Sequence, residues 1–150
     1  MDELTPHQCL ELLRGEKVGH LAVISEGIPY VTPCSFVVLD SAIAMRVAEG
    51  RRVRAIRENP VASFEVSEYN MDTGDWSSVI VEGSMEIVED DATIQNVIAG
   101  LLAKYRPVVS TMAGQVMPML NEVVIQLNIS TMTGRSSGSF FSMRTRPGRL

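Results

Sequence analysis

The stretch VGHLAVISEGIPYVTPCSFVVL, residues 18–39, is the part of the chain that decides the fold. It consists of two apolar runs, 18–25 and 28–39, separated by the pair Glu26-Gly27. A Glu-Gly pair between two apolar runs indicates a two-residue hairpin turn, so we expect two adjacent antiparallel strands. Because both runs carry long apolar stretches instead of strict alternation, we expect burial on two faces, by the core on one side and by a helix or a second subunit on the other.

The regions on either side of this hairpin add four strands and three helices. Further strands are predicted at 42–48, 61–68, 76–89 and 120–131, with Gly83 marking a bend or bulge. Helices are predicted from a capping box at Thr5 to Gly15, over 50–59, and along an apolar stripe from Ile94 to Tyr105 that Pro107 closes. Six strands in mostly hairpin order predict an antiparallel β-barrel with flanking helices, and argue against a parallel α/β sheet.

Composition restricts the class of protein. The 150 residues are 45% hydrophobic and 21% charged, which is typical of one soluble globular domain. No apolar run approaches the roughly 20 residues of a membrane-spanning helix, and the N-terminus does not resemble a signal peptide. The two cysteines, Cys9 and Cys34, and the two histidines lack disulfide or zinc spacing, so we expect a cytoplasmic protein with reduced thiols and no metal site.

The net charge of −5 conceals an acidic body and a basic end. Four of the 13 basic residues are arginines at or after Arg135, which leaves nine basic against 18 acidic residues in 1–134. An acidic body argues against nucleic acid as a partner, because binding a polyanion requires a basic face. We interpret residues 137–150 as a basic Ser/Gly/Arg tail, partly ordered, outside a domain at 1–136.

The segment AEGRRVRAIRENP, residues 48–60, places arginines in the first turn of a predicted helix. Arginine there opposes the helix dipole, whose N-terminus is already partly positive. An anion at this position would explain the pattern, because backbone N–H groups and guanidinium groups would converge on a phosphate. Arg46, on the preceding strand, is within reach of the same point. The alternative is a solvated basic face paired with Glu49 and Glu58.

Two further segments carry candidate ligand contacts. Pro29 and Pro33 remove two backbone donors from one strand, which confines that strand to a sheet edge or bulge and would leave amide groups free for a flat ring. Trp76 begins a later strand and is the single tryptophan, suited either to ring stacking or to a core or interface position. The sequence lacks Gly-x-Ser-x-Gly, P-loop and Gly-x-Gly-x-x-Gly motifs, so an enzymatic role would require a cofactor.

Taken in order, five motifs resemble the pyridoxamine-phosphate-oxidase-like family of flavin-binding split barrels, and most closely its branch of nitroimidazole-resistance proteins. The motifs are VGHLA (18–22), GIPYVTP (27–33), AEGRR with NP (48–52 and 59–60), WSSV with Gly83 (76–79), and the strand from Ile129 that ends in Thr133-Gly134-Arg135. The resemblance implies a six-stranded antiparallel split β-barrel of Greek-key type. It also implies a homodimer that binds two flavin mononucleotides (FMN) at its interface.

The resemblance assigns roles to individual residues. Residues implied to line the flavin ring are Thr32, Pro33, Cys34 and Ser35; those implied to hold the phosphate are Arg46, Arg51 and Arg52; those approaching from a neighbouring strand or the other subunit are Trp76, Ser77 and Ser78. It implies an FMN-dependent oxidoreductase acting on a small flat substrate. The alternatives are a non-enzymatic module that carries or senses a flavin or haem, and a structural dimer. No catalytic residue is predicted.

Overall fold

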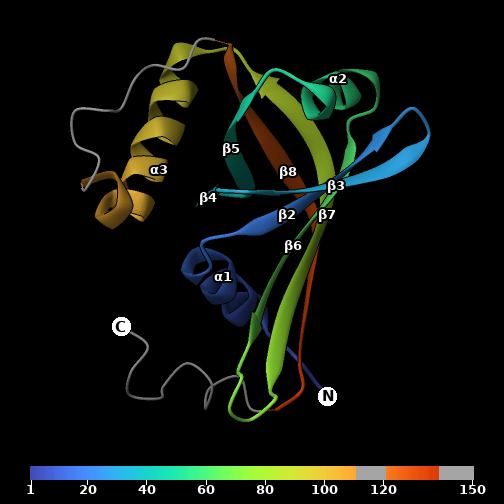
Figure 1. The fold of residues 1–150 in the computed structure, drawn as a ribbon, viewed down its shortest axis with the longest axis vertical. Coiled ribbons are helices and arrows are strands. Elements are labelled where there is room, and N and C mark those ends of the chain that lie inside the picture. Colours follow the sequence, from blue (N-terminus) through green and yellow to red (C-terminus); the bar gives the residue numbers. More distant parts are fainter. Residues whose placement is uncertain (111–120, 139–150) are drawn as a thin grey trace.

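The computed structural model describes residues 1–110 and 121–138, which form one antiparallel sheet with three helices around it (Figure 1). Within those residues the strand order is β3-β2-β6-β7-β8-β5-β4, and β1 pairs with the far end of β8. The strands are β1 (Asp2–Glu3), β2 (Gly19–Ser25), β3 (Ile28–Cys34), β4 (Val37–Leu39), β5 (Ala42–Ala48), β6 (Val61–Tyr69), β7 (Trp76–Val88) and β8 (Glu122–Ser136). The helices are α1 (Pro6–Gly15), α2 (Arg51–Glu58) and α3 (Asp91–Ser110).

The mainly β fold with flanking helices confirms the split-barrel prediction, since the sheet curls without closing. The described residues form eight strands rather than six for two reasons. β1 has only two residues, too few to give a sequence pattern. The run predicted as one strand over 28–39 divides into β3 and β4, because Phe36 turns into the core and its N–H donates to the Tyr105 hydroxyl at 3.1 Å.

The β2–β3 hairpin has the predicted turn. Glu26 and Gly27 both have positive φ, 52° and 77°, which matches a type I′ turn. β3 is an edge strand, as its two prolines predicted. The predicted burial on two faces is not found within one chain, because His20 is exposed and Val31 retains 58% of its accessible surface. In the part of the chain that the structure describes, this outer face of the hairpin is exposed to solvent.

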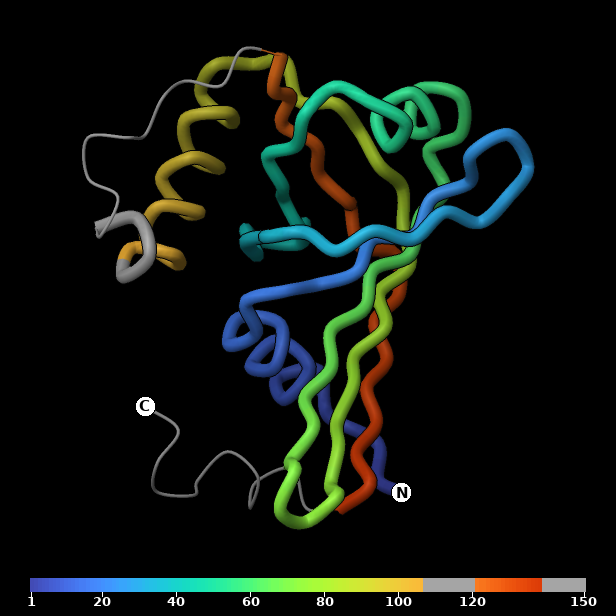
Figure 2. The backbone as a smooth tube through the Cα atoms, viewed as in Figure 1, coloured from blue at the N-terminus to red at the C-terminus, as the bar shows by residue number. Residues whose placement is uncertain are grey.

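β6, β7 and β8 form a long twisted ribbon that carries the lower part of the sheet (Figure 2). The register between β7 and β8 shifts at Glu82/Gly83, which confirms the irregularity predicted at Gly83. β8 continues to Ser136, beyond the predicted end at Thr131, because it pairs with β7 as far as Ser77 and also with β1. Its predicted first residue, Leu120, lies outside the described residues.

The helices lie on both faces of the sheet, α1 and α2 on its inner side and α3 on its outer side (Figure 1). α1 begins with the predicted capping box, in which Gln8 N donates to Thr5 Oγ1 at 3.2 Å and Thr5 N donates to Gln8 Oε1 at 2.9 Å. α3 begins after Asp90, whose carboxylate accepts from Thr93 N. The prediction that Pro107 closes α3 was wrong: the helix continues to Ser110, since a proline removes one backbone hydrogen bond without forcing the chain out of helical angles.

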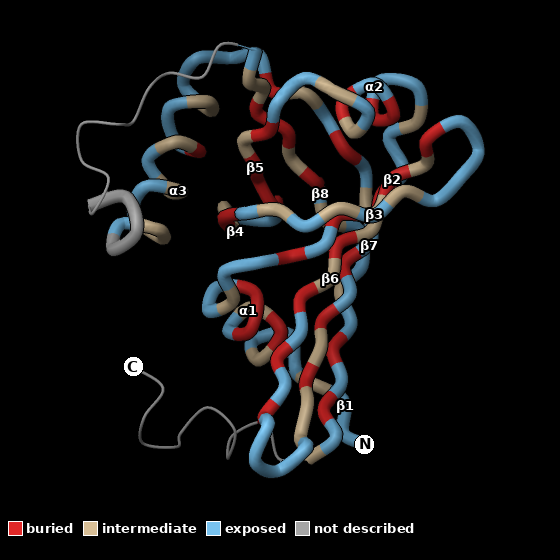
Figure 3. Tube along the Cα trace, in the orientation of Figure 1, coloured by how far each residue is buried: buried red, intermediate tan, exposed pale blue. Residues whose placement is uncertain are grey.

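Two apolar clusters hold these elements together (Figure 3). The larger one lies inside the curled sheet and joins α1 and α2 to it, with Phe36 and Phe64 in edge-to-face contact at 4.9 Å between ring centroids. The smaller one, around Val97 and Val124, packs α3 against the outer face of β5 and β8. Among the described residues, no helix is long and apolar enough to cross a membrane. Most of the basic tail, residues 139–150, lies outside the described residues.

Candidate functional site

The first turn of α2 lies against the edge strand β3. Gly50 caps this helix without a side-chain hydrogen bond, and the first turn contains no acidic residue. Arg52 Nη1 donates to Thr32 Oγ1 at 3.1 Å and to the Pro33 carbonyl at 3.4 Å. These contacts bring together three of the residues predicted for the site, and orient one guanidinium group beside the uncapped N–H groups of the helix.

Arg51 is held by two other contacts. Its guanidinium carbon lies 4.0 Å from the centroid of the Tyr30 ring, a cation–π contact, and its Nε donates to Ser25 Oγ at 3.0 Å. Sequence reasoning did not single out Tyr30 or Ser25 as site residues. The available signal for Tyr30 was its spacing from Thr32, because residues two apart on a strand point to the same face.

These side chains surround a pocket of about 300 Å³ with a positive charge. Its lining residues are Tyr30, Thr32, Pro33, Ala48, Glu49, Gly50, Arg51 and Arg52. The one carboxylate there, Glu49, is engaged by Arg57, with 3.0 Å between Arg57 Nη1 and Glu49 Oε2, and this hydrogen bond lowers the pKa of Glu49. Neither Arg51 nor Arg52 forms an ion pair within the described residues. The alternative of a solvated basic face paired with Glu49 and Glu58 therefore holds for Arg57, which pairs with Glu49, but not for Arg51 and Arg52.

Cys34 and Ser35 follow Pro33 along the same edge. The Cys34 thiol is partly buried, with its Sγ 3.5 Å from Met45 Sδ. Burial raises the pKa of Cys34 to about 11, against the opposing charge of Arg52. The thiol is therefore neutral near pH 7 and is a poor nucleophile there. Ser35 is exposed, in the break between β3 and β4.

Arg46 is not brought to this pocket within one chain. On β5, Met45 and Val47 point into the larger core cluster, whereas Ala44 belongs to the cluster beneath α3. Because side chains alternate along a strand, Arg46 shares the face of Ala44, where it forms an ion pair with Glu122. The prediction rested on sequence distance and on the family resemblance, whereas strand alternation places the Arg46 side chain on the opposite face of β5.

Trp76, Ser77 and Ser78 lie at the other end of the ribbon from α2 (Figure 1). Val61, just after α2, pairs with Ser84 of β7. Ser77 lies seven residues before Ser84 on the same strand, which is a distance of about 23 Å. Trp76 N donates to Ser137 Oγ at 2.8 Å. One chain therefore does not bring this segment to the arginine pocket, and of the two predicted routes only approach from another subunit remains.

The outer face of the sheet carries a second feature, which is apolar. A pocket of about 300 Å³ there is lined by His20, Ala22, Val31, Ser63, Phe64, Glu65 and Ile80. His20 Nδ1 lies 3.1 Å from Glu65 Oε2, so the imidazole is oriented by a carboxylate. The sequence pattern indicated no partner for His20, and the pairing of β2 with β6 brings Glu65 opposite it. The described residues contain no group of three or more His, Cys, Asp or Glu side chains able to hold a metal ion.

The open antiparallel barrel with a basic pocket at its edge defines a split β-barrel protein. The chain belongs to the pyridoxamine 5′-phosphate oxidase family, whose model matches residues 5–136. No curated protein sequence matches the chain.

Solved structures share the fold at low sequence identity. A protein from Mesorhizobium loti described as FAD-binding is 24% identical, with a TM-score of 0.73 over 91% of this chain and 98% of that one. A candidate 5-nitroimidazole antibiotic resistance protein from Bacteroides thetaiotaomicron is 15% identical, with a TM-score of 0.71 over 90% and 86% of the two chains. A haem-binding protein from Mycobacterium smegmatis is 18% identical, with a TM-score of 0.70 over 89% of this chain and 59% of that one.

Proposed function

We propose that this chain binds a flavin nucleotide by its phosphate, and that Arg51 and Arg52 are the groups that hold it. The observation that carries the proposal is the pair of guanidinium groups, anchored on the β2–β3 hairpin beside the uncapped start of α2, neither of which forms an ion pair among the described residues. FMN is the smallest flavin with such a phosphate. A flavin as the ligand class is supported by the structurally similar protein from Mesorhizobium loti, which is named as FAD-binding.

The pocket fits a phosphate in both charge and donors. Arg52 donates to Thr32 and Pro33 through Nη1, so its other guanidinium N–H groups are available to an anion. The N–H groups of the first turn of α2 are a further set of donors with favourable dipole. Beside the pocket, β3 is an edge strand with two prolines, and the flat ring would lie along the free edge of the sheet at Thr32 to Ser35.

We propose that the working unit is a homodimer in the cytoplasm. The outer sheet face presents Val31 and Ile80 at 58% and 47% exposure around an apolar pocket, and apolar surface of this kind favours association. A second copy is also the remaining way for Trp76, Ser77 and Ser78 to approach the flavin. Cys9 is buried and neither cysteine forms a disulfide, which suits a reducing compartment.

We further propose an oxidoreductase role, with a small flat substrate docked at the dimer interface. A bound flavin supplies hydride or electron transfer. The chain's own residues would hold the phosphate and exclude water from the ring. The alternative is a module that carries or senses a flavin or haem without turnover; the relative named as haem-binding keeps this alternative open. An experiment can distinguish the two roles. In an oxidoreductase, an added quinone should reoxidise the chemically reduced flavin; in a carrier whose flavin ring is covered by protein, it should not.

The binding proposal is tested by titrating the purified chain with FMN. We expect Arg52→Gln to weaken FMN binding at least tenfold, on the order of 1.4 kcal/mol, because a charged hydrogen-bond donor to the phosphate is lost. Arg14→Gln, an exposed arginine on α1, is the matched control and should bind FMN normally. A wild-type chain that binds neither FMN nor FAD would overturn the proposal, as would equal binding by Arg52→Gln.

A further inference from the structure

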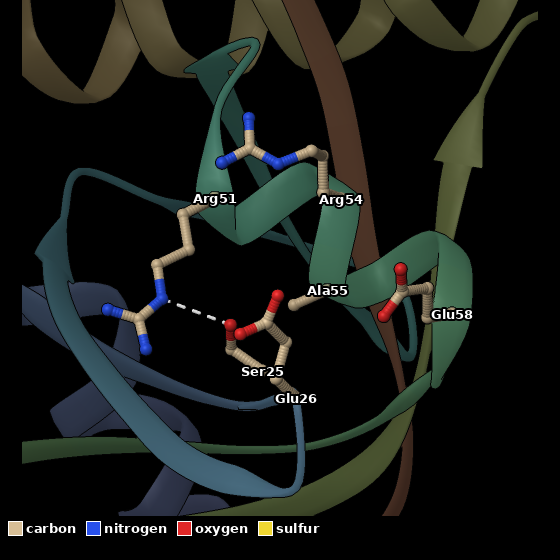
Figure 4. Close-up of a pocket in the computed structure, with 6 residues that line it drawn as sticks. All are labelled: Ser25, Glu26, Arg51, Arg54, Ala55 and Glu58. Atoms are coloured by element: carbon tan, nitrogen blue, oxygen red, sulfur yellow. Dashed lines mark hydrogen bonds between the residues drawn. The ribbon is translucent and has the colours of Figure 1, made fainter.

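A second pocket adjoins the arginine pocket and shares Arg51 with it. Its volume is about 350 Å³, and its lining residues are Ser25, Glu26, Arg51, Arg54, Ala55 and Glu58 (Figure 4). It lies between the β2–β3 turn and the exposed side of α2, with buried Ala55 at its base. Arg51 thus separates two cavities of similar size.

The two pockets differ in charge. The first has Arg51 and Arg52 with its carboxylate neutralised by Arg57. The second balances two guanidinium groups against Glu26 and Glu58, and neither of these carboxylates forms an ion pair within the part of the chain that the structure describes. A second phosphate deep in this pocket would meet two negative charges. A neutral group rich in hydroxyls would instead donate hydrogen bonds to them.

The side chains in Figure 4 show how the pocket is divided. Arg51 reaches across to Ser25, and its Nε–H···Oγ bond of 3.0 Å fixes the guanidinium at the boundary between the cavities. The carboxylate of Glu26 lies beside Ser25, while Arg54 and Glu58 extend from α2. A ligand that passes Arg51 therefore leaves a basic cavity and enters one with carboxylate acceptors on two sides.

We propose that this second pocket holds the adenosine half of flavin adenine dinucleotide, so that the preferred ligand is FAD rather than FMN. The proposal rests on the flavin binding proposed above. The pyrophosphate lies over Arg51 at the boundary, the ribose hydroxyls donate to Glu26 or Glu58, and the adenine stacks on the planar guanidinium of Arg54. Carboxylates are the groups that recognise a nucleotide ribose through its hydroxyls in dinucleotide sites. An FMN molecule would leave the second pocket to water.

The test is a comparison of FAD and FMN binding to the full-length chain by isothermal titration calorimetry. We expect FAD to bind at least tenfold more tightly than FMN. In the double variant Glu26→Gln/Glu58→Gln, FAD affinity should fall toward that of FMN, while FMN affinity should not fall, since the variant removes only negative charge near the phosphate. Glu11→Gln, the same chemical change on the exposed face of α1, should alter neither affinity.

The outcomes separate this inference from the proposed function. If neither flavin binds, both fail. If FMN binds as tightly as FAD to the wild-type chain, flavin binding stands and the adenosine site is overturned. The adenosine site is also overturned if the double variant retains the full preference for FAD. The wild-type comparison uses no variant, so a misfolded variant cannot conceal the result.

Discussion

Lys104 is a residue whose charge is set by its surroundings rather than by its sequence neighbours. Its ammonium group lies 3.5 Å from the centroid of the Phe36 ring, and its Nζ donates to the Leu13 carbonyl at 3.4 Å. Burial lowers the pKa of Lys104 to about 8, and the nearby charge of Lys17 acts in the same direction. Folding therefore disfavours the charged form of Lys104.

We expect this lysine to make stability rise with pH. The pKa of Lys104 is about 8 when folded and 10.5 in its ordinary state, so between these values the unfolded chain binds more protons. The contribution is of order 1–2 kcal/mol once solvent screening of a partly exposed group is allowed for. Lys104→Met should remove this rise. The measurement is urea denaturation of both chains between pH 7.5 and 10.5, and parallel pH profiles for the two would contradict the assignment.

At the scale of an element, the β7–β8 ribbon depends on one close backbone approach. A Cβ at Gly83 would lie 2.0 Å from the Asn128 carbonyl oxygen, a contact that requires backbone movement. The register shift at Glu82/Gly83 bends the ribbon at this point. The upper part of β7 thereby follows β8 toward α3, and the lower part continues to Trp76.

Gly83→Ala should destabilise the chain by about 2–4 kcal/mol, because the Asn128 carbonyl belongs to the backbone and cannot rotate aside. Ser84→Ala, at an exposed neighbouring position, is the control and should change stability little. Urea midpoints measure both effects. A Gly83→Ala chain as stable as the wild type would show that the ribbon accommodates a side chain here.

For the whole molecule, the outer sheet face is the surface on which the proposed dimer would form. Ala22, Val31 and Ile80 lie together on this face beside the His20–Glu65 pair. Directly opposite residues on paired strands share a face, which is how these side chains from β2, β3, β6 and β7 come to form one surface. Covering it would supply the second buried face that the apolar runs predicted.

Val31→Glu combined with Ile80→Glu should yield a folded monomer, because the buried charges would oppose dimer formation while both positions are exposed in a single chain. Met71→Glu, at an exposed apolar residue in the loop between β6 and β7, should leave a dimer. Light scattering after size-exclusion chromatography gives the mass, and circular dichroism checks the fold. A wild-type chain that is itself monomeric would contradict the homodimer proposal.

Local patterns were sufficient for most elements of the fold. The Glu26-Gly27 turn, the Thr5 capping box and the bounds of β5 follow from signals within a few residues, and the structure confirms them. Long-range pairing explains the exceptions. β8 extends past Thr131 because β7 and β1 pair with it, and the break after Cys34 depends on Tyr105, about 70 residues away.

The candidate site divides in the same way. Arg51 and Arg52 were identified by sequence because their position in a helix's first turn is a local electrostatic anomaly. Their anchors, Ser25 and Tyr30, depend on how α2 packs against the hairpin. Arg46 and Trp76 were placed near the pocket on sequence order and family resemblance, and one chain puts them on another face and at another end.

The sequence by itself determined the β-rich class, the edge position of the strand with two prolines, and the basic start of α2, since each follows from residues adjacent in the chain. Only the tertiary structure decided that Arg51 separates two cavities of different charge, that His20 meets Glu65, and that, among the described residues, the outer face of the β2–β3 hairpin is exposed. These features join segments that are distant in sequence. They arise from strand register and helix docking, which no local pattern contains.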